Sequence, residues 1–97
     1  MLCALTVRTL KPGTFDQFRE AFLSRMPAGK PPAGWVRFNM IRSGDEVVCF
    51  GFFDGTRAEM QSWAQDYDYE GQQRAIAPFV ESVGADSVFE IVEDLTP

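Results

Sequence analysis

Two stretches of the sequence carry hydrophobic side chains on both faces, a pattern typical of strands in the middle of a sheet. In 47–53, Val47, Cys49 and Phe53 alternate with Val48, Phe50 and Phe52; in 2–9, Cys3, Leu5 and Val7 alternate with Leu2, Ala4 and Thr6. The helices of so short a chain can cover one face of such a sheet. We therefore expect a second copy of the protein to cover the other face.

A first helix is predicted after the turn at Lys11-Pro12-Gly13. Thr14 and Gln17 have the spacing of a capping box, and Pro27 is expected to end the helix. The apolar residues of its predicted buried face recur every three or four positions: Phe15, Phe18, Phe22 and Met26. The Pro- and Gly-rich segment 27–34 that follows is predicted to be a surface connector.

A second helical region is predicted to begin with a capping box at Thr56 and Glu59. The helical spacing is interrupted at 66–71 and then resumes. The expected buried positions are Met60, Trp63, Ala64 and Tyr67, followed by Ile76, Phe79, Val80 and Val83. A kink or a new start is expected near Pro78, and Gly84 is placed to cap the C-terminal end.

Two further strands complete the predicted fold, at Trp35–Arg42 and Ser87–Glu93. A short turn at 43–45 joins the former to the core strand. The order is then strand, helix, strand, strand, broken helix, strand. This order fits an α+β, ferredoxin-like βαββαβ domain with a four-stranded antiparallel sheet, spanning residues 1–97 as one domain.

The amino-acid composition excludes some classes of binding partner and of cofactor. A net charge of −5 with two lysines argues against a nucleic-acid or anionic-membrane surface. No apolar run approaches the roughly 20 residues that span a bilayer, and the N-terminus resembles a strand more than an export signal, so a cytoplasmic protein is expected. The absence of histidine removes the commonest metal ligand and general base, and we expect no metal and no cofactor. Cys3 and Cys49 are expected to be reduced.

The chain resembles the antibiotic biosynthesis monooxygenase family of dimeric α+β barrel proteins over nearly its whole length. The resemblance is carried by 5–8 leading into 11–18, and by 47–54 leading into the helix with Trp63. It implies a dimer in which two sheets pair face to face, with a ligand cavity between sheet and helices in each subunit. Family members include cofactor-free oxygenases of aromatic polyketides and haem-degrading enzymes.

The family's catalytic residues are largely absent from the matching positions. The Asn and Trp that the resemblance implies for the cofactor-free oxygenases are replaced by Cys49 and Phe53. Of the Asn, Trp and His implied for haem degradation, only Trp63 is present, with Thr6 and Gln73 at the other positions.

Five residues are candidates for binding a ligand: Trp35, Arg37, Asn39, Trp63 and Tyr67. Trp35, Arg37 and Asn39 are expected on one face of their strand, where Asn39 could bind an oxyanion and Arg37 could neutralise an anion. Trp63 and Tyr67 lie on the inner stripe of the second helix, where packing is the alternative role. Tyr67 is the candidate base.

Two functions remain open on the sequence. One is a homodimeric protein that binds a small hydrophobic or aromatic molecule without catalysis. The other is a cofactor-independent monooxygenase, in which the electron-rich anion of an aromatic substrate reacts with oxygen.

Overall fold

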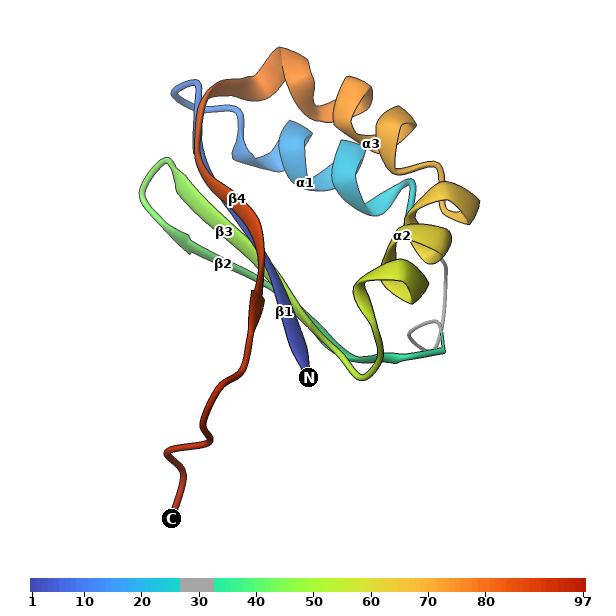
Figure 1. The fold of residues 1–97 in the computed structure, drawn as a ribbon. Coiled ribbons are helices and arrows are strands. Elements are labelled where there is room, and N and C mark those ends of the chain that lie inside the picture. The colour runs from blue at the N-terminus through green and yellow to red at the C-terminus, as the bar shows by residue number, and fades with distance from the viewer. Residues whose placement is uncertain (27–32) are drawn as a thin grey trace.

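The computed structural model describes residues 1–26 and 33–97, so most of the predicted connector at 27–34 lies outside the described residues. The elements follow the predicted order (Figure 1). Their bounds are β1 Leu2–Leu10, α1 Phe15–Leu23, β2 Trp35–Ser43, β3 Glu46–Phe53, α2 Arg57–Asp66, α3 Tyr69–Ile76, the 3-10 turn η1 Ala77–Phe79, and β4 Val80–Glu90.

The four strands form one antiparallel sheet in the order β2-β3-β1-β4. The ferredoxin-like α+β prediction is therefore confirmed. The central strands are β1 and β3. These are the two stretches for which the sequence predicts apolar side chains on both faces. A central strand has a neighbouring strand on each side, so apolar side chains on both of its faces are flanked by other side chains. This is why apolar residues on both faces indicate a central strand.

All three helices lie on one side of the sheet (Figure 1). Two clusters of buried side chains lie between the layers. One contains Leu2, Trp35, Phe53 and Met60, and the other contains Leu10, Phe18, Val47 and Ile76. The predicted stripe of α1 is confirmed for Phe18, which is fully buried, and for Phe15 and Phe22, which pack against the second cluster. Met26 lies beyond the end of the helix.

A register shift between Trp35 and Arg37 changes the predicted faces of β2. Trp35 is buried on the helix side and packs against Phe38, whereas Val36 is 57% exposed. The expectation that Trp35 shares a face with Arg37 and Asn39 was wrong. One extra residue in a strand reverses the alternation on either side of it, and the sequence gives no signal of where that residue falls.

The start and end of α1 differ from the prediction. Thr14 is the N-cap residue, but its side chain makes no cap bond: its hydroxyl lies 2.7 Å from the Lys11 carbonyl oxygen and 3.3 Å from that of Phe79. The capping box predicted at Thr14 and Gln17 was therefore wrong. The helix ends at Leu23, before Pro27, and the Ser24 hydroxyl donates back to the Ala21 carbonyl oxygen at 2.9 Å.

The second helical region begins as predicted and breaks inside the predicted interruption. The Thr56 and Glu59 capping box is present, with both reciprocal hydrogen bonds. The break lies at Asp68, which has a left-handed backbone (φ 58°) and caps α3 by accepting from the Gly71 N–H at 3.2 Å. Asp and Asn adopt this conformation more readily than most residues, because their short side chains can bond locally.

The last strand begins earlier than predicted. Pro78 lies in η1, where the helix ends, and β4 starts at Val80 and ends at Glu90. The prediction that the helix continues to Val83 and is capped by Gly84 was therefore wrong. The strand predicted at 87–93 exists, but its start and its end were both placed too late. Proline cannot donate a helical hydrogen bond, and the following residues pair with β1 instead: Val80 with Leu10 and Val83 with Arg8.

Among the described residues, no helix covers the sheet face opposite α1, α2 and α3 (Figure 1). By strand alternation this face carries apolar side chains. Its central residues are half-buried: Cys3, Leu5 and Val7 of β1 with Val48, Phe50 and Phe52 of β3. Ile41 is 52% exposed and Phe89 48% exposed.

Cys3 and Cys49 are both free thiols. Among the described helices, none has the length and hydropathy to cross a membrane.

Candidate functional site

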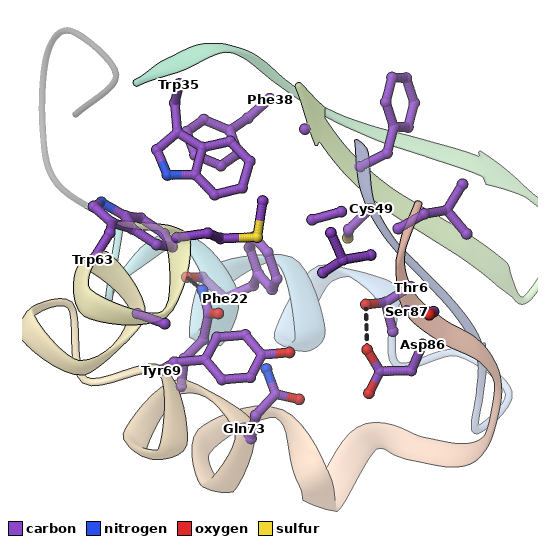
Figure 2. Close-up of a pocket in the computed structure, with 18 of the residues that line it drawn as sticks. Thr6, Phe22, Trp35, Phe38, Cys49, Trp63, Tyr69, Gln73, Asp86 and Ser87 are labelled. Atoms are coloured by element: carbon purple, nitrogen blue, oxygen red, sulfur yellow. Dashed lines mark hydrogen bonds between the residues drawn. The ribbon is translucent and has the colours of Figure 1, made fainter. Parts of the chain in front are cut away.

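A cavity of about 340 Å³ lies between the sheet and the helices (Figure 2). Its lining comes from all four strands and all three α-helices. The aromatic end is lined by Phe22, Trp35, Phe38 and Trp63 with Met26 and Met60; the polar end is lined by Thr6, Arg8, Cys49, Tyr69, Gln72, Gln73 and Asp86. The cavity is thus apolar at one end and hydrogen-bonding at the other.

The aromatic end is a cluster of rings from β2 and α2. The Trp35 ring lies 4.5 Å from that of Phe38 and 5.0 Å from that of Trp63, between ring centroids, and Phe38 and Trp63 are 6.1 Å apart. Gly51 of β3 makes this packing possible, because a Cβ there would lie 2.8 Å from Trp35 and 2.9 Å from Phe38. Rings at these separations form a firm wall for a flat apolar ligand.

The polar end is built across neighbouring strands and α3. Thr6 pairs with Cys49 on β3 and with Asp86 on β4, so the three side chains form a row on the helix-facing side. The Thr6 hydroxyl donates to the Asp86 carboxylate at 3.1 Å (Figure 2). From α3, the Gln73 amide oxygen accepts from Arg8 Nη2 at 3.1 Å.

Burial shifts the pKa of two titratable groups at the polar end of the cavity toward the neutral form. It raises the pKa of the Cys49 thiol, and the Arg8 guanidinium partly opposes that shift. It also raises the pKa of the Tyr69 hydroxyl, an effect to which the Asp86 carboxylate adds. Both groups are therefore in their neutral forms near neutral pH and can act as hydrogen-bond donors there.

Three of the five candidate ligand-binding residues belong to the lining: Trp35, Asn39 and Trp63. Trp35 and Trp63 are in mutual contact at the aromatic end. Asn39 borders the cavity from the sheet, but it pairs with Phe50, so its side chain alternates onto the sheet face opposite the helices. The amide oxygen of Asn39 is buried and has no hydrogen-bond partner among the described residues.

Arg37 and Tyr67 do not line this cavity. Arg37 is exposed on β2. Tyr67 stacks on Trp63 at 4.8 Å, accepts from Gln72 Nε2 at 2.9 Å, and lines a separate pocket with Arg25. Burial raises the pKa of Tyr67 to about 12, against the opposing charge of Arg25. A phenol with that pKa holds its proton near neutral pH, and so is a poor base there.

None of the residues of the polar end is among the five candidates, and Arg8 is the one that a pattern in the sequence marks. It is 3% exposed, in a helix-facing row of β1 that otherwise reads Leu2, Ala4, Thr6 and Leu10. A charged residue inside the apolar alternation of a central strand is the signal that marks it, since such residues are rarely buried without a partner. The contact with Gln73 joins positions 65 residues apart and has no local signal.

Of the five positions that the family resemblance indicates, four line the cavity and one does not. Thr6, Cys49, Trp63 and Gln73 all line the cavity. Phe53 does not; it packs in the core cluster with Trp35. In the ranges 1–26 and 33–97, no group of three or more His, Cys, Asp or Glu side chains is placed to hold a metal ion.

Solved structures show the same fold over nearly the whole chain. A Mycobacterium tuberculosis protein superposes with a TM-score of 0.78 at 13% identity, covering 98% of each chain. A proposed antibiotic biosynthesis monooxygenase from Nitrosomonas europaea gives 0.71 at 14% identity, covering 96% of this chain and all of that one. SnoaB, a cofactor-independent oxygenase from Streptomyces nogalater, gives 0.67 at 15% identity, covering 99% and 97%.

The fold is therefore that of the antibiotic biosynthesis monooxygenase-like proteins, as the sequence resemblance predicts. At these identities the likeness is one of fold, and a shared fold does not carry a shared activity. No family model matches the sequence, and no curated protein matches it.

Proposed function

We propose that this protein binds a small hydrophobic, aromatic molecule in the cavity between its sheet and helices, and does so as a homodimer. The observation that supports the proposal is the cavity of about 340 Å³ with its wall of Trp35, Phe38 and Trp63. Ligand pockets are typically about 300–1,000 Å³, mostly apolar, with a few polar groups that orient the ligand. This cavity has both properties.

A cavity-filling substitution tests the binding proposal. Ala64 of α2 lines the cavity, and Ala58 of the same helix is exposed and outside the lining. We expect neutral bicyclic aromatics such as 2-naphthol to raise the melting temperature of the wild type and of Ala58→Phe. Ala64→Phe should fold, by circular dichroism, and show no such rise. Equal rises in all three proteins would place the ligand elsewhere and contradict the proposal.

The dimer proposal rests on the uncovered face of the sheet. Phe50 and Phe52 of β3 contact each other on that face, with ring centroids 5.9 Å apart, beside Leu5 of β1. Burying a large apolar side chain contributes about 1.5–3 kcal/mol, so such a face favours association. A second copy supplies a self-complementary cover, because two-fold symmetry places the same patch on both subunits.

Cofactor-independent oxygenation is a second candidate function. It is favoured by the fold shared with SnoaB, described as a cofactor-independent oxygenase, and by a carboxylate in the cavity lining, Asp86. In this candidate Asp86 accepts the hydroxyl proton of a hydroxylated aromatic substrate, and a ring carbon of the resulting phenolate attacks oxygen to form a hydroperoxide. Loss of water from the hydroperoxide leaves the quinone, so molecular oxygen is the oxidant and water the second product. The candidate does not use Tyr67, whose raised pKa disfavours a basic role near neutral pH.

Oxygen uptake tests this second candidate. We expect consumption with a panel of hydroxylated polycyclic aromatics, reduced by about 10²–10⁴-fold in Asp86→Asn, the range that general-base catalysis contributes. Asp16→Asn, an exposed substitution on α1, is the control and should retain full activity. If the wild type consumes no oxygen with any member of the panel, this second candidate is contradicted.

A further inference from the structure

Arg8 is a buried cation whose hydrogen bonds are incomplete. Its side chain crosses from β1 toward α1 and α3, with the guanidinium carbon 5.9 Å from the centre of the Phe18 ring. Nη2 donates to the Gln73 amide oxygen. Nη1 is buried and has no partner among the described residues. Since a guanidinium keeps its charge throughout the physiological pH range, this nitrogen remains a charged donor without an acceptor.

No carboxylate of the described residues forms an ion pair with Arg8. The ion pairs present join Arg25 to Asp68 and Arg57 to Glu90. Asp86 lies at the same end of the cavity, but its carboxylate accepts from Thr6. A buried charge is costly unless an opposite charge and further hydrogen bonds compensate it. The described groups around Arg8 are the Gln73 amide, the Phe18 ring and the Cys49 thiol, all of them neutral, so the charge has no anion within ion-pair distance.

Gln73 presents a second unused donor beside it. Because its amide oxygen accepts from Arg8, the amide nitrogen is the free end of the group, and that nitrogen is also buried without a partner among the described residues. Arg8 Nη1 is bonded to the same carbon as Nη2, which makes the hydrogen bond. The Gln73 amide nitrogen is bonded to the same carbon as the amide oxygen that accepts it. The two donors therefore lie at the same end of the cavity, which both residues line.

We propose that Arg8 and Gln73 form an anion site for a carboxylate on the aromatic ligand. This inference rests on the proposed ligand cavity and specifies the class of molecule that enters it. A guanidinium and an amide N–H match the planar geometry and charge of a carboxylate. A simple phenol, with a pKa near 10, is neutral at physiological pH and would leave the charge of Arg8 uncompensated.

The two ends of the cavity then recognise two parts of one molecule. The aromatic part lies against Trp35, Phe38 and Trp63, and the carboxylate lies at Arg8 and Gln73. In Figure 2, the labelled Gln73 lies on the far side of the cavity from Trp35 and Phe38. A cavity of about 340 Å³ is at the small end of the range for ligand pockets. Compact aromatic carboxylates are therefore the ligand class.

Isothermal titration calorimetry with three matched probes tests the inference: 2-naphthoate, its neutral amide 2-naphthamide, and 2-naphthol. All share the ring system and differ in the polar group. We expect the carboxylate to bind about tenfold or more tightly than either neutral probe, the difference that a charge-assisted hydrogen bond makes. The substitution Arg8→Met should remove that preference, with the affinity for 2-naphthamide held within about twofold. Arg8→Lys should retain part of it.

The control is Arg37→Met, which removes an exposed arginine of β2 outside the lining and should leave all three affinities unchanged. Circular dichroism establishes that each variant is folded. Equal affinities for the carboxylate and the neutral probes, or a preference that survives Arg8→Met, would overturn the anion site and leave the aromatic cavity standing. If none of the three probes binds, the proposed ligand cavity itself is contradicted.

Discussion

Trp35 of β2 and Trp63 of α2 meet edge to face across the cavity wall, with ring centroids 5.0 Å apart and ring planes at 61°. The contact joins an edge strand of the sheet to a helix. It also means that the only two tryptophans of the chain both line the cavity. One pair of rings therefore contributes both to the packing of the layers and to the ligand wall.

Removing the strand partner of this pair should be strongly destabilising. Trp35→Ala is expected to lower the free energy of unfolding by about 3–5 kcal/mol, because it leaves a large void next to Phe53 and Met60. Trp35→Phe keeps an aromatic ring and removes an indole N–H that is buried without a partner, so its loss should be clearly smaller. Urea unfolding at one fixed protein concentration measures both. Equal losses would show that the ring itself contributes little.

The packing of Phe53 predicts how the chain responds to the residues typical of cofactor-free oxygenases. A Cβ at Gly34 would lie 2.5 Å from the Phe53 ring, and a Cβ at Gly55 would lie 2.6 Å from it, so both glycines pack closely against the ring. Phe53→Trp should therefore cost about 1–3 kcal/mol of stability through overpacking. Thermal unfolding of Phe53→Trp, alone and with Cys49→Asn, measures the cost. A variant as stable as the wild type would contradict this account of the site.

The sequence predicts the sheet better than it predicts the cavity. The two-faced strands 2–9 and 47–53 identify the centre of the sheet, because the alternation of side chains is a local property. The face of Trp35 depends on a single-residue register shift, and the start of β4 depends on pairing with β1, neither of which has a local signal. Arg8 can be flagged from its place in an apolar strand, but its partner Gln73 comes from a distant helix.

Tyr67 should make stability fall at alkaline pH. Its folded pKa of about 12 lies above the ordinary value of 10, so the folded state holds the phenolic proton more tightly than the unfolded state. The resulting stabilisation, up to about 2 kcal/mol, is complete below pH 10 and is lost as the pH rises toward 12. Urea unfolding across this range should show a steeper loss for the wild type than for Tyr67→Phe. Parallel curves would contradict the assignment.

The proposed dimer predicts a specific response to charge on the uncovered sheet face. Sedimentation equilibrium of the wild type at micromolar concentration should give twice the chain mass of 10.9 kDa. Phe50→Lys places a charge in the centre of the face and should shift the protein to monomer or to aggregates. Gln17→Lys places the same charge on the exposed side of α1 and should leave the dimer intact. A soluble wild-type species at the mass of one chain would refute the dimer.

The ligand cavity is tested most directly by the tryptophan fluorescence of the protein, because both tryptophans line it. Titration with 2-naphthol should change the emission of the wild type and of Ala58→Phe in a saturable way, with one ligand bound per chain. The change should be absent in folded Ala64→Phe, whose added ring occupies the cavity. An emission that stays constant in the wild type, or that changes equally in Ala64→Phe, would contradict the ligand cavity.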